Sequence, residues 1–401
     1  MADLTTRCCI VGGGPAGMML GYLLARGGID VAVLEKHGDF LRDFRGDTVH
    51  PSTMQVMHEL GLLDAFLARP HSEVRQLAAQ IGDELLTLAD FSHLPVQAKF
   101  IAFMPQWDFL DFLADEAKRY PAFRLLMRTE ATDVIREGET VVGIGAQGPE
   151  GALTIRAELV IACDGRHSTI RDAAGFQVID RGAPMDVLWL RLSKSPSDPG
   201  QTFGRIDAGR FFIMLDRNDY WQCAYVIPKG GIERVQAQGL EAFRADIVKL
   251  APYLRDRVRE IASWDDVKLL TVAVNRLDTW YKPGLLCIGD AAHAMSPVGG
   301  VGINLAIQDA VATANILVPR LRQGAVTTDD LRAVQRRREW PTRMTQRMQL
   351  FIQNRVISNV LRRQTTPKAP WIIRMFGQVP ALRRLPARVI GLGFQPEHIR
   401  H

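Results

Sequence analysis

The sequence predicts an α/β protein built on a parallel sheet, with a mainly antiparallel sheet inserted into it and a helical segment towards the C-terminal side. Three observations support this fold class. A strand, a glycine-rich turn and a helix open the chain, and two later apolar strands each end near an aspartate, Asp164 or Asp290. Between these aspartates lies a series of aromatic-rich strands separated by turns. At 401 residues, the chain is long enough for two or three domains.

The opening unit has the pattern of strand, helix and strand. Apolar residues 8–11 predict a buried strand, and residues 15–26 have helical periodicity that stops at a pair of glycines. Residues 31–34 predict the second strand, which Glu35 closes.

Three glycines in the intervening turn, Gly12, Gly14 and Gly17, match the pattern G-x-G-x-x-G. The first permits the tight turn, the second lets the backbone approach a pyrophosphate, and the third lets helix and strand pack closely. The free N–H groups at the start of the helix suit that pyrophosphate. Glu35, eighteen residues after Gly17, can accept ribose hydroxyls. We therefore expect an adenine dinucleotide here, the alternative being a glycine-rich turn without a ligand.

The composition is that of a globular protein, with 47% hydrophobic and 23% charged residues. No apolar run is expected to reach the ~20 residues of a membrane span, and the first residues lack a signal-peptide pattern. The five cysteines lie in apolar, strand-like runs without metal-ligand spacing. We expect buried thiols in a reducing cytoplasm, with a redox pair at Cys8 and Cys9 as the alternative.

Positive charge is concentrated towards the C-terminal side. Residues 331–401 carry fourteen arginines and one lysine against two glutamates, a net charge of +13 within a total of +5. The preceding 330 residues therefore sum to −8, so the basic pI does not indicate a nucleic-acid partner.

Hydrophobic periodicity predicts the elements between these regions. In the first half we expect a loop and helix at 37–66, with Gly61 interrupting the helix near its end, then strands at 76–81 and 85–88 and a helix at 105–119. Strands at 132–136, 141–146 and 153–157 follow. The aromatic-rich part is expected to be an antiparallel meander of strands at 187–192, 202–206, 211–215 and 221–227, followed by helix within 239–262. We interpret this part as a smaller domain inserted in the first.

A second motif lies in residues 159–171. A near-continuous apolar run predicts a parallel strand buried on both faces. It ends in Asp164-Gly165, which places a carboxylate at the carboxyl edge of the sheet, where such sheets bind ligands. Ser168 and Arg171 follow, one helical turn apart. Alone, an Asp-Gly strand end would indicate an ordinary turn, but here it occurs together with the glycine-rich turn after the first strand and with a third motif further along the chain.

The third motif, residues 284–304, repeats the pattern. An apolar strand ends in Gly289-Asp290, and Pro297 with a glycine-rich turn leads into a helix expected at 303–317. The first N–H groups of that helix suit an electron-rich carbonyl or a developing anion. His293 is either a base or, as we favour, a structural residue packed behind the turn.

On these three motifs, residues 5–340 resemble the para-hydroxybenzoate hydroxylase-like, single-component FAD-dependent monooxygenases. The resemblance implies a discontinuous Rossmann-like FAD-binding domain, an inserted substrate domain and a helical C-terminal segment. The implied boundaries are 1–75, 100–181 and 276–340 for the FAD-binding domain, 76–99 and 182–275 for the substrate domain, and 341–401 for the helical, basic C-terminal segment.

The resemblance also implies residue roles. Glu35 would hold the adenosine ribose and Asp290 the ribityl chain. Asp164 would serve both FAD and the reduced nicotinamide, and Pro297 would lie beside the flavin ring, to which residues 303–304 would present the helix N-terminus. No residue is assigned as catalytic. The implied cofactor-binding residues are Gly12, Gly14, Pro15, Ala16, Gly17, Glu35, Lys36, Arg45, Gln106, Asp164, Gly289, Asp290, Pro297, Gly302, Ile303 and Asn304.

The chain shows no nucleophile–base constellation and no metal-ligand spacing, as expected when a cofactor carries the chemistry. The resemblance implies non-covalent FAD, reduced by NADH or NADPH, which reacts with O2 to a flavin hydroperoxide and hydroxylates or epoxidises an aromatic or lipophilic small molecule. The aromatic strands would keep water out. The sequence does not distinguish NADH from NADPH.

Three alternatives share the cofactor domain. A polyprenyl or geranylgeranyl-type flavin reductase would insert no oxygen, and a flavin-dependent cyclase would use FAD only as a structural wall. A flavin halogenase is disfavoured because the pattern W-x-W-x-I-P is absent, residues 221–223 being Trp-Gln-Cys.

The C-terminal segment departs from the best-known members of that family, since we expect no thioredoxin-like domain. Apolar residues at 371–376 lie among basic ones, and we interpret the segment as helices packed on the FAD-binding domain with a solvated basic face. The alternative is a surface in weak peripheral contact with anionic membrane, or a lid over a lipophilic substrate. We expect a cytoplasmic monomer or homodimer.

Overall fold

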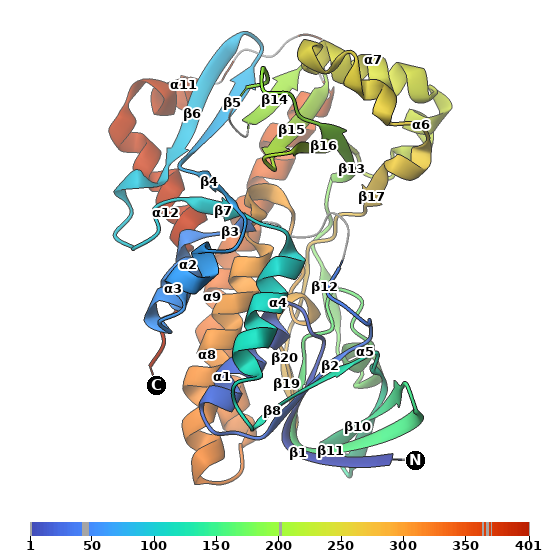
Figure 1. The fold of residues 1–401 in the computed structure, drawn as a ribbon, viewed down its shortest axis with the longest axis vertical. Helices are drawn as coiled ribbons and strands as arrows, with labels where there is room; N and C mark the ends of the chain where they lie inside the picture. The colour runs from blue at the N-terminus through green and yellow to red at the C-terminus, as the bar shows by residue number, and fades with distance from the viewer. Residues whose placement is uncertain are drawn as a thin grey trace.

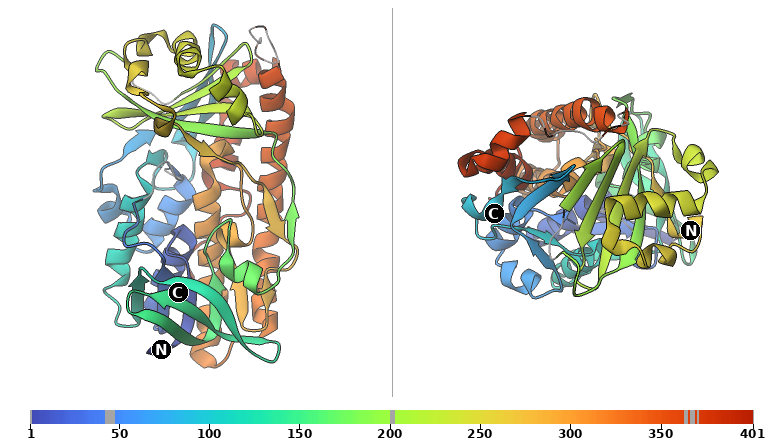
Figure 2. Two further views of the ribbon diagram at one scale, coloured as in Figure 1. Left: turned by 90° about the vertical axis from the view of Figure 1, so that its right-hand side faces the viewer. Right: turned by 90° about the horizontal axis from the view of Figure 1, so that it is seen from above.

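The computed structural model describes residues 2–41, 48–199, 203–362, 365, 369 and 371–400. The molecule is elongated, with an eight-stranded sheet at one end and a seven-stranded sheet at the other (Figure 1). Helices α8 (Gly302–Gln323) and α9 (Thr328–Ile352) pack on each other and run along the long axis (Figure 2).

The eight-stranded sheet has the order β19-β20-β11-β1-β2-β8, and the β9–β10 hairpin is attached to β11. Neighbours from β20 to β8 are parallel, as the continuous apolar runs predict. Helix α1 (Pro15–Arg26) is buried against this sheet and packs on α8 and α4 (Gln106–Ala117). The strands are β1 (Ala2–Val11), β2 (Val31–Glu35), β8 (Phe123–Met127), β9 (Glu130–Glu137), β10 (Thr140–Gly148), β11 (Gly151–Ala162), β19 (Tyr281–Lys282) and β20 (Leu285–Cys287).

One element differs from the prediction in this part, and another agrees with it. Strand β11 is continuous, whereas the sequence predicted separate strands on either side of residue 158. Glu158, the polar residue in this run, pairs with Arg7 on the neighbouring strand β1 at 2.7 Å, so it needs no turn. The expected interruption of the helix within residues 37–66 is confirmed, because Gly61, whose φ is +73°, separates α2 (Pro51–Glu59) from α3 (Leu63–Leu67).

The seven-stranded sheet has the order β17-β13-β16-β15-β14-β5-β6. The predicted meander is present in β14, β15 and β16, but β13 pairs with β16 instead of β14. The other edge of β14 pairs with β5 in parallel, which joins residues 76–90 to the sheet. The strands are β5 (Gln76–Ile81), β6 (Glu84–Asp90), β13 (Met185–Ser193), β14 (Phe203–Asp207), β15 (Arg210–Asp216), β16 (Tyr220–Pro228) and β17 (Lys268–Leu270).

This sheet is covered on both faces. On one face, Leu188 and Phe212 pack with Phe243 and Ile247 of α7 (Leu240–Leu250). On the other face, alternate residues such as Val187 pack against the segment that follows α9. The side-chain alternation of each strand therefore builds two separate apolar layers.

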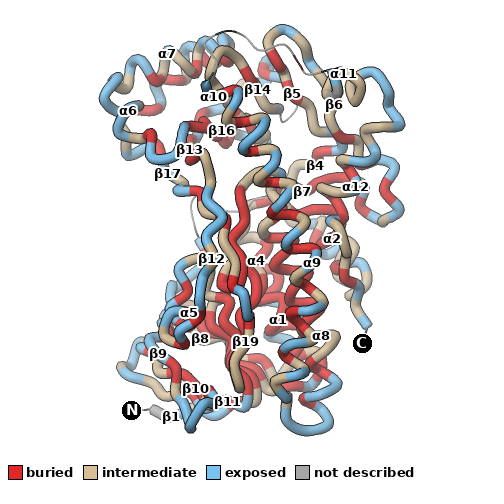
Figure 3. The backbone as a smooth tube through the Cα atoms, turned by 180° about the vertical axis from the view of Figure 1, so that it is seen from behind, coloured by how far each residue is buried: buried red, intermediate tan, exposed pale blue. Residues whose placement is uncertain are grey.

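The remaining short elements lie between the two sheets or beside one of them, and buried residues concentrate along α1, α8 and the central strands (Figure 3). These elements are β3 (Thr48–Val49), β4 (Ser72–Val74), β7 (Ile101–Phe103), β12 (Val178–Asp180), β18 (Asn275–Leu277), α5 (Thr169–Ala173) and α6 (Ile232–Ala237). The five cysteines are all buried and free of disulfides.

The C-terminal segment forms a curved run of helices (Figure 2). Helix α9 passes into a π-helical stretch, Gln353–Ile357, and then α10 (Ser358–Arg362), α11 (Trp371–Gln378) and α12 (Arg384–Leu392). Helix α11 packs on β6, while α12 packs on both β6 and α2. The expected packing on the first domain is therefore only part of the arrangement, because this segment also covers the seven-stranded sheet.

The segment Val298–Gln323, which includes α8, has the length and a mean hydropathy of 1.4 that would suit a membrane-spanning helix. This differs from the expectation that no apolar run reaches such a length. Of its most apolar window, 72% is buried inside the fold, where α8 packs on α1. Its apolarity matches that of a core helix.

Candidate functional site

The turn between β1 and α1 is shaped by glycines. Gly12 has a φ of +105°, and a Cβ on it would lie 2.5 Å from the carbonyl oxygen of Cys163. A Cβ on Gly17 would lie 2.0 Å from the carbonyl oxygen of Gly12, so the close packing of helix and strand depends on its absence. A Cβ on Gly14 would meet no atom within 4 Å, and the first turn of α1, starting with Pro15, has no side-chain cap. This leaves open backbone at the position where a pyrophosphate would approach.

Glu35 closes β2 beside this turn. Its Oε2 accepts a hydrogen bond from the Gly13 N–H at 3.2 Å, and its Oε1 accepts one from the His37 N–H at 3.0 Å. The carboxylate therefore braces the glycine turn, in addition to the ribose contact that the resemblance implies. Lys36 is exposed and lies 4.0 Å from Glu130, which directs it along the surface.

The Asp164 carboxylate organises the loop after β11. Ser168 donates its hydroxyl to Oδ1 at 2.5 Å, and the Ile170 N–H donates to Oδ2 at 3.2 Å. Ser168 in turn caps α5 by accepting from the Arg171 N–H at 3.0 Å. Burial raises the pKa of Asp164, although these hydrogen bonds oppose the effect. Asp164 thus has a structural role in the loop in addition to the role the resemblance implies.

Arginines connect the loops that follow β11 and β20. Arg171 is buried and donates to the carbonyl oxygens of Arg166, at 3.1 Å, and Ala291, at 3.5 Å. Arg166 also lies 3.8 Å from the Asp290 carboxylate. Arg166 is not among the residues expected at the site, although its place directly after Asp164-Gly165 at a strand end was a usable signal.

Behind the Gly289 turn lies a buried charged network. Asp309 accepts from the Gly289 N–H at 3.1 Å, contacts His293 Nε2 at 2.6 Å, and accepts from Arg338 Nε at 2.9 Å. Burial raises the pKa of Asp309, but His293 and Arg338 outweigh burial and hold it below its usual value. His293 is 1% exposed and packs on Trp280. This placement supports the structural interpretation of His293 over the alternative as a base.

The amide of Asn304 fastens the start of α8 to the chain before α2. Its oxygen accepts from the His50 N–H at 2.8 Å and the Thr53 hydroxyl at 2.7 Å, and its nitrogen donates to the Thr48 carbonyl at 3.0 Å. The side chain is therefore committed to the protein, and only the backbone here can present the helix N-terminus to a flavin. A Cβ on Gly302 would meet no atom within 4 Å, which keeps that N-terminus open.

The three motifs meet at one edge of the eight-stranded sheet, because β20, β11, β1 and β2 are adjacent and parallel. The first and third motifs touch, since a Cβ on Gly289 would lie 3.2 Å from the Ala16 Cβ. Gln106 begins α4, beside α1. Pro297 precedes the turn at Gly299, whose φ is +81°. Arg45 lies outside the described residues.

The inner face of the seven-stranded sheet forms an apolar wall. Val187 and Val226 cluster there with Trp189 and with Val298, which directly follows Pro297 in the chain. Among the described residues, Trp189 Nε1 and Gln353 Oε1 are buried without a hydrogen-bond partner. Each therefore retains hydrogen-bonding capacity for a ligand.

A family model described as "FAD binding domain" matches residues 5–348. The chain is 31% identical to 6-methylpretetramide 4-monooxygenase of Streptomyces rimosus, over 98% of this chain and 94% of that relative. It is 27% identical to rifampicin monooxygenase of Streptomyces venezuelae, over 75% of this chain and 61% of that relative.

Solved structures share the fold. A crystal structure of pqsL, described as a probable FAD-dependent monooxygenase from Pseudomonas aeruginosa, superposes with a TM-score of 0.75 at 22% identity, over 90% of this chain and 98% of that one. OxyS anhydrotetracycline hydroxylase from Streptomyces rimosus gives 0.74 at 21% identity, over 97% and 76%.

Proposed function

Since this chain belongs to the FAD binding domain family and is an FAD-dependent monooxygenase, we propose that it hydroxylates a flat, fused-ring aromatic small molecule. The observation that carries the proposal is the 31% identity to 6-methylpretetramide 4-monooxygenase over 98% of this chain. That similarity includes the C-terminal helices that cover the seven-stranded sheet. The reductase and cyclase alternatives gain no support from this full-length relative.

The residues at the sheet edge fit FAD. Open backbone at Gly14 and the uncapped start of α1 would receive the pyrophosphate, Glu35 the ribose, and Asp290 the ribityl chain. Bound FAD would supply the redox chemistry, with electrons from NADH or NADPH and oxygen from O2. The protein would bind and orient FAD and the aromatic substrate, and it would exclude water.

The apolar wall suits a planar, hydrophobic substrate with polar substituents. Trp189 Nε1 could donate to a carbonyl or phenolic oxygen, and Gln353 Oε1 could accept from a phenolic hydroxyl. Gln353 is held in place because its amide nitrogen donates to the Ser296 hydroxyl. A buried polar atom without a partner costs about 1–3 kcal/mol, which a correctly placed hydroxyl would recover.

The test is to compare fused-ring phenols with single-ring phenols in NADH- and NADPH-driven oxygen uptake. We expect fused-ring phenols to accelerate oxygen uptake and to give a product heavier by one oxygen atom. Gln353→Leu should raise KM for them while leaving the FAD content unchanged. If no fused-ring phenol stimulates turnover, or if single-ring phenols are the better substrates, the proposal is wrong.

A further inference from the structure

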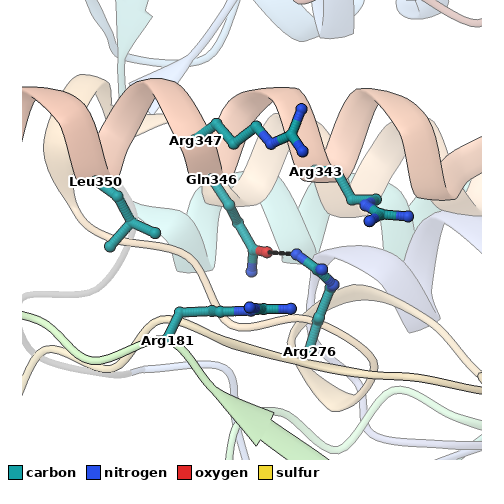
Figure 4. A pocket seen from close by; sticks show the side chains of 6 residues that line it. All are labelled: Arg181, Arg276, Arg343, Gln346, Arg347 and Leu350. Carbon is teal, nitrogen blue, oxygen red and sulfur yellow. Dashed lines mark hydrogen bonds between the residues drawn. The ribbon is translucent and has the colours of Figure 1, made fainter.

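A cavity of about 180 Å³ lies between α9 and the β12–β18 pair (Figure 4). One water needs only ~10–15 Å³ on this measure, so the cavity has room for a polyatomic ligand. Four guanidinium groups surround it. Its lining residues are Arg181, Arg276, Arg343, Gln346, Arg347 and Leu350. None of them belongs to the residues implied for FAD.

These guanidinium groups are poorly compensated by protein carboxylates. Within the described parts of the chain, Arg181, Arg276 and Arg347 have no carboxylate oxygen within 4 Å, while Arg343 lies 3.2 Å from Glu339. Arg276 donates to the neutral Gln346 Oε1 at 3.2 Å.

Electrostatics inside the pocket favour an added negative charge. Burial lowers the pKa of Arg276, and repulsion by Arg181, Arg343 and Arg347 lowers it further, while Glu339 opposes them. Like charges that converge on one cavity repel each other, and an anion between them would relieve that repulsion.

We propose that this pocket binds a phosphate-class oxyanion, supplied either by free phosphate or diphosphate or by the phosphate groups of a dinucleotide. Guanidinium groups pair with phosphate through two parallel hydrogen bonds, which a lysine cannot do. A concave pocket suits a small anion better than an extended anionic surface.

The pocket is also connected to the chain beside the cofactor site. Gln346 Nε2 donates to the carbonyl oxygens of Asn275, at 2.8 Å, and Ala294, at 3.2 Å. Ala294 lies three residues before Pro297, so Gln346 links the pocket lining to the chain that leads to Pro297. The proposal does not depend on which aromatic substrate is hydroxylated.

The test is calorimetric titration of the FAD-loaded protein with inorganic diphosphate at low salt. We expect saturable binding that weakens as salt rises. Arg347→Gln should weaken binding about fivefold, the upper range for one exposed charge pair, and combining it with Arg181→Gln should weaken binding further. Arg336→Gln is the matched control, because Arg336 is exposed on the same helix but does not line the cavity, and it should bind like the wild type.

Absence of saturable binding would overturn the proposal, as would equal losses in Arg336→Gln and Arg347→Gln. FAD content and circular dichroism would show that the variants are folded. Competition by NADP⁺ and NAD⁺ distinguishes the sources: displacement of diphosphate by either nucleotide indicates a dinucleotide ligand, and unchanged diphosphate affinity in their presence indicates free phosphate or diphosphate.

Discussion

The opening unit, β1–α1–β2, and residues 331–401 both pack on the core around the eight-stranded sheet, but through contacts of different range. In the opening unit, the decisive contact joins Gly12 and Gly17, five residues apart. Within residues 331–401, Arg338 contacts Asp309, 29 residues away, and Glu397, 59 residues away. Function that depends on local backbone geometry leaves a readable sequence pattern, whereas a buried ion network between distant residues does not.

The largest effect should come from the long-range network. Arg338→Met would leave the buried carboxylates of Asp309 and Glu397 without this partner, which should cost about 3–5 kcal/mol of unfolding free energy in denaturant titration. Arg337→Met is the matched control, because Arg337 is partly exposed although it lies 2.7 Å from Glu397, and it should cost less than about 1 kcal/mol. Equal costs would show that the buried network is not what anchors the segment.

In the opening unit, substitution of Gly17 should cost almost as much stability as Arg338→Met, whereas substitution of Gly14 should cost almost none. Gly17→Ala should destabilise the apoprotein by about 3 kcal/mol because the added methyl meets the Gly12 carbonyl. Gly14→Ala should leave the Tm of the apoprotein unchanged, since its methyl meets no atom within 4 Å, yet weaken FAD binding. A fall in apoprotein Tm for Gly14→Ala would contradict this division.

The stability of the protein should depend on pH through His50, at the contact between the C-terminal segment and α2. His50 Nδ1 donates to the Ile390 carbonyl at 2.7 Å, and burial lowers the pKa of His50 to about 4. The fold favours neutral His50, so its stabilisation is complete above the unfolded pKa of about 6.5 and is lost as pH falls towards 4, by roughly 3 kcal/mol at most. His50→Gln should show a smaller loss of stability between pH 7 and pH 4.5 than the wild type. The same loss in both proteins would refute the assignment.

Substitution of Glu35 can distinguish a role in binding the nucleotide from a role in supporting the glycine turn. Glu35→Ala should weaken FAD by about ten- to a hundredfold, the value of a hydrogen bond to a charged group, and weaken riboflavin much less. Fluorescence titration with both flavins measures this. Because Glu35 also accepts from the Gly13 N–H, equal losses for both flavins would mean that it acts only through the turn.

The smallest effect concerns the outer face of the C-terminal segment. Trp371 is 72% exposed in a part of the sequence rich in basic residues, and each basic residue near an anionic bilayer contributes about 1 kcal/mol. If the face touches membrane, the protein should co-sediment with anionic liposomes at low salt, release as salt rises, and bind less after Trp371→Ser. We favour the absence of such binding, and co-sedimentation with neutral liposomes would show non-specific adhesion.

The sequence predicted the elements that depend on interactions between residues close together in the chain. The glycines of the first turn, the helix over residues 15–26 and the strand before Asp164 follow from turn geometry and periodicity. The parallel pairing of β5 with β14 was not predicted, because strand partners distant in sequence carry no local signal. The arginine-rich composition near the C-terminal side suggested a solvated face, yet Arg338 is fully buried, since composition does not reveal which arginine meets a distant carboxylate.

The burial of Glu397 against Arg338 also imposes an order in time. At synthesis rates of about 5–20 residues per second, the 59 residues between them take several seconds to emerge. During that interval a nascent chain can form the opening unit and α9, while Arg338 still lacks one of its two carboxylates. Docking of the stretch that carries Glu397 is therefore a late step of maturation, and until it occurs Arg338 has only the Asp309 carboxylate and water as partners.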